Sequence, residues 1–298
     1  MVEVFSIFDT TREKTEQKQP YLPCKSGVIV ENYGLTYSHI SPLLAMSKSK
    51  KSIKPLEFSP TISSEQLVIK DNALIMASYS LTVEEQRLIL ACIEKAQRQK
   101  DPLSNPAIEI TLNVKEYADL YGVKMGTAYK ALSNSSDKLY DRSIRMTDKE
   151  NGEVEVRWLQ EKAKYSSGKV RLRFSDTVSR HIREIVTEQT TYRLHQATQL
   201  RTQHSIRLFE ILNMVMDPIT KEGEWTVSID KMKDLFEISD LYDRWVDFKK
   251  YVIVQSVANI NENTSFKVDW EVAGKEGKRI SDIRFTVFES EQLPLFAN

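Results

Sequence analysis

The chain has 298 residues with 42 basic and 42 acidic side chains, so its formal net charge is zero and no overall field draws it to a polyanion. Binding to nucleic acid would therefore need local basic patches. Two cysteines, Cys24 and Cys92, indicate reduced thiols instead of a disulfide framework. The N-terminus lacks the pattern of a signal peptide, and no run of about 18 apolar residues could span a membrane. We expect a soluble cytoplasmic protein.

Residues 1–65 differ in composition from the rest of the chain. They contain prolines at 20, 23, 42, 55 and 60, a basic stretch from Ser47 to Lys54, and little apolar periodicity. We expect this region to be a flexible, poorly ordered N-terminal arm. The basic stretch could contact phosphates, although its composition is also that of a solvated linker.

Regular patterns begin at residue 66. The stretch 67–81 is predicted to be extended, and Thr82 with Glu85 three residues later forms the capping-box pattern that opens a helix over 83–97. The predicted elements that follow are a strand at 107–112, a helix at 114–121 closed by Gly122, a longer helix at 127–143, two strands at 144–148 and 153–160 around an Asn151-Gly152 turn, and a strand at 169–174. Short helix, longer helix and hairpin is the order of a winged helix.

The longer helix has two distinct faces. Its predicted core face consists of Ala128, Leu132, Ser135 and Leu139, joined by Tyr129 and Tyr140. The opposite face gathers Thr127, Lys130, Asn134 and Lys138.

The same order of elements then repeats. A connecting helix, capped by Ser175 or Asp176, is expected within 175–200. Beyond it come a helix at 205–215, a strand at 225–227, a short helix at 229–238, a long helix at 241–263, and a hairpin formed by 266–272 and 279–288 with GKEGK at its tip. The Arg-Leu pairs at 87–88 and 207–208 occupy equivalent places, as do the tripeptides at 119–121 and 234–236. The fold class is therefore predicted to be α+β, with two tandem winged-helix domains related as an internal repeat.

The long helix at 241–263 is amphipathic. The predicted apolar side consists of Leu241, Trp245, Phe248 and Val252, widened by Val246, Ile253, Val257 and Ile260. The polar side gathers Asp243, Arg244, Asp247, Lys250, Tyr251 and Gln255. Any surface helix could show this pattern, but a helix placed before a wing and present in two copies favours recognition of a DNA major groove.

Four separated blocks resemble the iteron-binding plasmid replication initiators, the family that includes the F-plasmid initiator. The blocks run in order between Leu67 and Phe288 and are NALIMASYSLTVEEQRLILACI, YADLYGV with AYKALSNSSDKLYDRSI, SIRLFEILN, and DFKKYVIVQSVANINENTSFKVDW with ISDIRFTV. The expected domains are the arm at 1–65, a first winged-helix domain at 66–185 for dimerisation and DNA contact, a second at 186–290 for the main DNA recognition, and a tail at 291–298.

The resemblance implies a plasmid replication initiator that binds direct repeats (iterons) in an origin as a monomer and helps to open an adjacent AT-rich region. It also implies recruitment of the host initiator DnaA and the replicative helicase, with autorepression by a dimer. The alternative is a winged-helix transcriptional regulator without a replication role, which would need neither two fused copies nor a replication-type tail.

The sequence contains no pattern of an active site. A relaxase needs a close His-x-His pair, whereas His39, His181, His195 and His204 are far apart. No GxxxxGK[ST] loop is present to hold nucleotide phosphates. We therefore expect a protein that is not an enzyme and uses no cofactor or metal.

The candidate DNA contacts come from both repeats. Arg244 and Lys250 are predicted to bind guanine edges, and Asp247 a cytosine amino group, with Tyr251 beside them. Lys249 falls within the apolar arc, so its alkyl chain is expected to lie over the core while its amine reaches a phosphate. The remaining candidates are Lys275, Lys278 and Arg279 at the wing tip, and Thr127, Lys130, Asn134 and Lys138 in the first repeat.

The C-terminal stretch QLPLF resembles the peptide by which bacterial replication factors bind the sliding clamp. Leu293, Leu295 and Phe296 would fill an apolar pocket, while Gln292 would form a hydrogen bond at its edge. Pro294 departs from the commoner Ser or Asp. The alternative is a tail folded back on its own domain.

Overall fold

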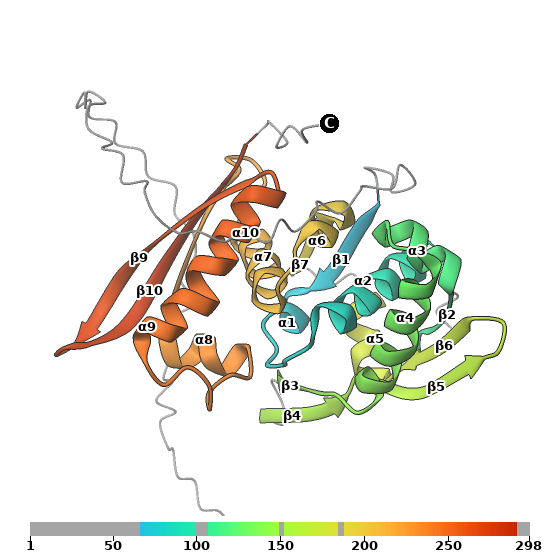
Figure 1. Cartoon of the computed structure of the whole chain (residues 1–298). Helices are drawn as coiled ribbons and strands as arrows, with labels where there is room; N and C mark the ends of the chain where they lie inside the picture. Colours follow the sequence, from blue (N-terminus) through green and yellow to red (C-terminus); the bar gives the residue numbers. More distant parts are fainter. Residues whose placement is uncertain (1–65, 99–106, 149–151, 184–187, 291–298) are drawn as a thin grey trace, which may run out of the picture. The chain divides into compact units, whose positions relative to one another are not determined.

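The computed structural model describes residues 66–98, 107–148, 152–183 and 188–290, all of which belong to one compact unit of the chain (Figure 1). The predicted arm at 1–65 and tail at 291–298 lie outside the described residues. The helices are α1 (Asn72–Ile75), α2 (Val83–Arg98), α3 (Val114–Tyr121), α4 (Met125–Tyr140), α5 (Asp176–Arg183), α6 (Leu194–Gln199), α7 (Gln203–Val215), α8 (Ile229–Leu235), α9 (Trp245–Phe248), the π-helix η1 (Lys249–Val254) and α10 (Gln255–Asn263).

The strands pair in small antiparallel sheets. They are β1 (Leu67–Asp71), β2 (Glu109–Asn113), β3 (Ser143–Asp148), β4 (Gly152–Arg157), β5 (Leu159–Tyr165), β6 (Lys169–Phe174), β7 (Gln189–Arg193), β8 (Glu222–Ser228), β9 (Phe266–Glu276) and β10 (Arg279–Glu289). Within the described ranges they form sheets in the orders β1-β7, β2-β6-β5, β3-β4 and β8-β10-β9. Mixed helices and antiparallel sheets confirm the predicted α+β class.

Local signals start and stop the helices of the first repeat. The predicted capping box at α2 is present, because the Thr82 backbone N–H donates to Glu85 at 2.7 Å and the Glu85 N–H donates to Thr82 Oγ1 at 3.3 Å. Asn113 and Glu116 form a second capping box at α3. Gly122 ends α3 with φ of +59°, in the left-handed region that glycine adopts without strain.

The second repeat is built in the same way. Thr202 caps α7 with Ser205, as Thr82 caps α2 with Glu85, and Ser228 caps α8 by accepting from the Lys231 N–H at 3.1 Å. The wing is the long β9–β10 hairpin, against which α10 packs (Figure 1). The tip of this hairpin lies in the predicted GKEGK stretch.

A cation–π contact recurs in both repeats. The Arg87 guanidinium lies 5.4 Å from the ring centroid of Tyr121, and that of Arg207 lies 5.9 Å from the ring of Phe236. These four residues belong to the pairs and tripeptides that the sequence predicted to be equivalent. The duplication therefore extends from sequence to side-chain packing.

The structure corrects several predicted elements. The stretch at 67–81 is not wholly extended, because Asp71 accepts from the Ala73 N–H at 2.8 Å and so caps the short helix α1. The predicted strand at 153–160 divides at the fully buried Trp158 into β4 and β5, which pair in different sheets. The connecting segment contains not only α5 but also β7 and α6.

Two tyrosines predicted to lie in the core are exposed. Tyr129 and Tyr140 on α4 keep 54% and 38% of their surface, whereas Ala128, Leu132 and Leu139 are buried as predicted. Tyr129 follows the buried Ala128 directly, and adjacent residues on a helix point in different directions. Tyr140 instead packs under the Lys162 amine, which lies 4.9 Å from its ring centroid.

A buried polar cluster joins the two repeats. The Lys70 amine of β1 donates to Glu210 of α7 at 2.5 Å, and the Tyr192 hydroxyl of β7 donates to the same carboxylate at 2.7 Å. Arg207 donates to the Ala77 carbonyl at 2.8 Å and to the Tyr79 hydroxyl. Burial raises the pKa of Glu210, but the charges of Lys70 and Arg207 outweigh it and hold that pKa below its usual value.

The predicted boundary at residue 185 stays a prediction. Strand β7, which follows it in the chain, pairs with β1 from the other side of the boundary. At the surface, Arg145 of β3 forms ion pairs with Asp234 of α8 at 2.9 Å and with Glu237 at 3.4 Å. The segment after 185 is thus continuous in packing with both repeats.

Candidate nucleic-acid interface

The long helix of the second repeat starts later than predicted. Arg244 is its N-cap, with φ of −87° and ψ of 131°, and α9 begins at Trp245. Tyr242 adopts a left-handed conformation with φ of +58°, and its carbonyl accepts from the Lys233 amine at 2.9 Å. The turn therefore excludes residues 241–243 from the helix, and Leu241, predicted to be in the core, is 52% exposed.

The middle of this helix is a π-helix, η1, whose hydrogen bonds span five residues in place of the four of an α-helix, so its turn is wider. An α-helix that buries Phe248 and Val252 would also bury position 255, because positions i, i+4 and i+7 share one side. Instead Gln255 is exposed and Ser256 is fully buried. The π-helix thus moves the inward face by one residue.

This shift explains the broad apolar arc predicted from the sequence. Phe248 and Val252 form one apolar series, while Ile253, Val257 and Ile260 form a second series that a regular α-helix would direct elsewhere. With the π-helix between them, all five side chains are at most 9% exposed. Val246 was also predicted to lie in this arc, but it is 58% exposed.

The predicted base-contacting residues lie along the exposed side, partly paired with one another. The Arg244 guanidinium stands 3.8 Å from the Asp247 carboxylate at the start of the helix. The Lys250 amine donates to the Tyr251 hydroxyl at 3.2 Å and lies 4.7 Å from its ring centroid. Both pairs are at the surface, where such contacts are weak enough to be exchanged for others.

Lys249 is exposed. Its amine lies 5.4 Å from the ring centroid of Trp270 on β9. This cation–π contact keeps the side chain over the junction of helix and wing. Lys249 is therefore separated from the exposed row that carries Lys250.

The wing tip presents basic side chains. Lys275 and Lys278 are exposed, and within the described residues neither forms an ion pair. Gly277 between them has φ of +61° and makes the turn. Arg279, in contrast, pairs with Asp230 of α8 at 2.7 Å, so it also joins the tip region of the wing to the short helix.

In the first repeat, the four predicted residues line a single groove of about 620 Å³. Its lining consists of Thr82, Glu84, Lys124, Gly126, Thr127, Lys130, Ala131, Asn134, Ser135 and Lys138. The groove is open and basic, with three lysines against one carboxylate. Lys124 was not predicted, although its place at the start of a helix whose polar face had been identified could have indicated it.

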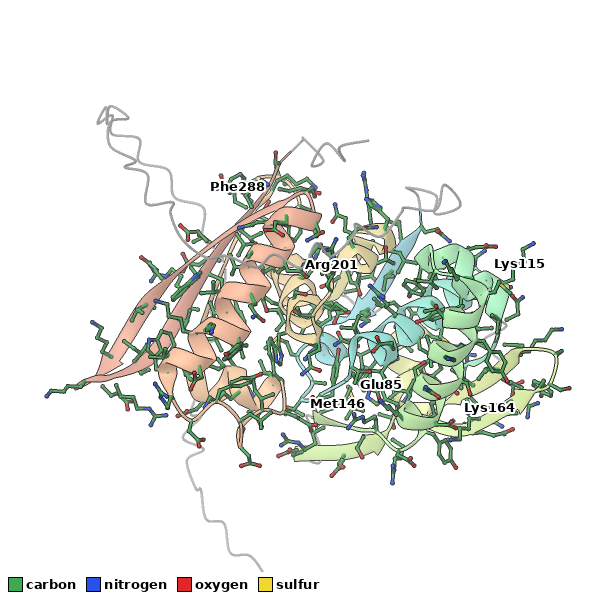
Figure 2. The ribbon with its side chains drawn as sticks, viewed as in Figure 1. Glu85, Lys115, Met146, Lys164, Arg201 and Phe288 are labelled. Carbon is green, nitrogen blue, oxygen red and sulfur yellow. The ribbon has the colours of Figure 1, made fainter. Side chains whose placement is uncertain are left out.

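Two further lysines lie beside α4. Lys162 and Lys164 of β5 both pair with Asp137, the first at 2.7 Å (Lys164 is labelled in Figure 2). The hydrogen bonds from these two amines lower the pKa of Asp137. Sequence reasoning missed them because β5 was predicted as the end of the preceding strand.

The described residues contain no group of three His, Cys, Asp or Glu side chains placed to hold a metal ion. Among the helices of the described ranges, none has the length and apolar character needed to cross a membrane.

Both repeats match family models of replication initiator proteins. Residues 67–213 match the family model described as initiator replication protein, WH1, and residues 228–287 match that described as initiator Rep protein, WH2. A replication initiation protein of Escherichia coli is 23% identical over 241 residues, which are 78% of this chain and 72% of that protein.

A solved structure is also similar. The Pi initiator protein, crystallised in complex with iteron DNA, superimposes with a TM-score of 0.65 at 19% sequence identity. The match covers 78% of this chain and all of the Pi chain. The two proteins therefore share the tandem winged-helix fold.

Proposed function

Because the chain belongs to the family of initiator replication proteins, we propose that it is a plasmid replication initiator that binds direct repeats in its origin as a monomer. The observation that carries the proposal is the helix α9–η1–α10, whose apolar series are buried while Lys250 and its neighbours project outward beside a basic wing. A helix of this kind fits the major groove, where base edges are read.

Residues at the start of the helix and in its middle would make the specific contacts. Lys250 and Arg244 can donate to the acceptors of guanine, and Asp247 can accept from a cytosine amino group. Contact with DNA would replace the weak surface pairs Arg244–Asp247 and Lys250–Tyr251. The DNA backbone near the wing would be contacted by Lys249, Lys275, Lys278 and Arg279.

The groove on α4 would bind DNA in a different way. The open surface of this groove is lined by Thr127, Lys130, Asn134 and Lys138. On such a surface the lysine amines can contact phosphates without contacting the bases. Phosphate contacts position a protein on the duplex but carry no direct sequence information. The first repeat would then set orientation, and the second would set specificity.

The remaining functions are proposed from the family. They are opening of the AT-rich region, recruitment of the host initiator DnaA and the replicative helicase, and autorepression by dimers formed through the first repeat. A plasmid-maintenance assay with the gene and a cloned origin separates this proposal from a transcriptional regulator, which would not sustain the plasmid.

The binding proposal is tested with a duplex that carries the origin repeats. Arg244→Ala or Lys250→Ala should weaken binding to the repeat by about 1–3 kcal/mol and relax its sequence preference. Lys115→Ala on α3, outside the groove and outside the recognition helix (α9–η1–α10), is the matched control (Lys115 is labelled in Figure 2). Full affinity and unchanged preference in both test variants would contradict the groove assignment.

The peptide QLPLF at 292–296 lies outside the described residues and is proposed to bind the sliding clamp. Gln292, Leu293, Leu295 and Phe296 are the expected contacts. Removal of the last seven residues should abolish capture of the clamp in a pull-down while DNA binding persists. Unchanged capture would refute this part of the proposal.

A further inference from the structure

The recognition helix exposes apolar side chains that its core does not use. Val246 is 58% exposed and Val254 is 41% exposed, although both lie in a helix whose inward residues are almost completely buried. Apolar groups left at a DNA-reading surface have one specific target in the major groove, the 5-methyl group of thymine.

The π-helix places these residues in one row. Because η1 lengthens the average turn, one series of buried positions recurs every fourth residue, at Phe248, Val252, Ser256 and Ile260, with Ile253 and Val257 buried beside it. Five of the exposed positions also recur every fourth residue, at Val246, Lys250, Val254, Ala258 and Glu262. A regular α-helix would spread such a series around its axis.

The exposed row therefore contains three small apolar side chains, one amine and, at its end, the carboxylate of Glu262. Lys250 lies between Val246 and Val254, and Ala258 follows one turn later. In the neighbouring row Gln255 is exposed beside Val254. A glutamine side chain can accept from the N6 amino group of adenine through Oε1 and donate to N7 through Nε2, so it complements the partner base of thymine.

We propose that Val254, with Ala258 beside it, reads thymine methyl groups and that Gln255 reads an adjacent adenine. The inference rests on the proposed binding of specific repeats, and it adds specificity residues beyond the charged ones. Loss of the thymine methyl contact should weaken binding about fourfold, which corresponds to one buried methylene-sized group. Loss of a bidentate adenine contact should weaken it about 5- to 150-fold.

The test begins with the full chain, which selects its own duplex from a random pool. Each thymine of the selected site is then replaced by deoxyuridine, which removes the methyl group and leaves the hydrogen-bonding edges intact. The wild type should lose affinity when deoxyuridine replaces thymine at one or two positions. At one of these positions Val254→Ala should bind the thymine duplex and the deoxyuridine duplex equally. Val272→Ala, an exposed valine of β9, is the matched control and should keep the wild-type sensitivity.

For Gln255, the adenines are replaced one at a time by 7-deazaadenine, which removes the N7 atom. The wild type should be sensitive at one adenine, and Gln255→Ala should be insensitive there. Equal losses in wild type and variants at every position would overturn the assignment while specific binding, and hence the proposed function, stood. If the pool yielded no enriched sequence, the proposed function would fail and this inference with it.

Discussion

The two repeats use the same order of elements to build different long helices. Helix α4 is a regular α-helix whose buried residues Ala128, Leu132, Ser135 and Leu139 recur at the spacing of an α-helix. Its counterpart α9–η1–α10 contains a π-helix, and its buried residues Phe248, Val252, Ser256 and Ile260 are four positions apart. The difference shows that one winged-helix plan can present two surfaces, a lysine-lined groove and a straight row of mixed side chains.

The first helices of the repeats differ in a second way. Arg87 of α2 and Arg207 of α7 make equivalent cation–π contacts, yet three residues later α2 carries the apolar Leu90 and α7 carries Glu210. The carboxylate makes α7 the centre of a buried ionic cluster. At this position α7 therefore depends on charge pairing with groups of both repeats, where α2 depends on apolar packing.

The largest effect is expected from breaking this cluster. Glu210→Gln leaves Lys70 and Arg207 buried without their counter-charge, which should lower the free energy of unfolding by about 3–5 kcal/mol. Urea denaturation measures the change, and the exposed Glu155→Gln on β4 is the control with less than about 0.5 kcal/mol. A loss below about 1 kcal/mol in Glu210→Gln would show that the pairing contributes little.

A pair of single-residue deletions tests the register of the recognition helix. Removal of Val254 takes one residue from η1, so the residues on both sides can bury their apolar groups in one regular α-helix. Removal of Ala258 instead displaces Ile260 from the core and should cost about 2–5 kcal/mol. Thermal unfolding should therefore rank the Val254 deletion as the more stable of the two, and the reverse ranking would contradict the role assigned to the π-helix.

Stability should depend on pH through His204 of α7. This residue is buried, whereas Glu84 at the equivalent position of α2 is exposed. Burial lowers the pKa of His204 to about 4, below the ordinary value of about 6.5. Between these pH values the unfolded chain binds a proton that the folded protein does not. The free energy of unfolding should therefore be highest above pH 6.5 and should fall by about 3 kcal/mol as the pH approaches 4.

His204→Phe should remove this contribution while a ring remains stacked on Phe236, with which His204 has a centroid distance of 5.7 Å. Urea unfolding at pH 7.5, 6.0 and 5.0 should give a flatter profile for the variant than for the wild type. Parallel profiles would show that His204 does not cause the acid sensitivity.

The smallest effect is expected from the groove of the first repeat. Lys138→Ala should weaken binding equally for the specific repeat and for unrelated duplex, and should reduce the slope of log affinity against log salt by about 0.9. Lys250→Ala should instead change the ratio between the two duplexes. A change in sequence preference caused by Lys138→Ala would remove the proposed division between the two helices.

Much of the fold could be predicted because its signals are local. The capping box of Thr82 and Glu85, the stop at Gly122 and the closing hairpin of the second repeat follow from neighbouring residues, and all three are present in the structure. The groove residues of α4 were found for the same reason, since a regular helix has a fixed period. Lys124, Lys162 and Lys164 were missed because their positions depend on which strand lies next to which helix.

By itself the sequence determined the two tandem repeats, the bounds of α2 and α3 to within one residue and the polar face of α4, since these depend on periodicity and on contacts within a few residues. Only the tertiary structure decided which side chains of the recognition helix face the core before and after the π-helix. Its two apolar series favour different sides of an α-helix, and both can reach one core only if a π-helix lies between them. Burial of both series is a property of the packed domain, so the exposed row of this helix could not be determined from the local pattern.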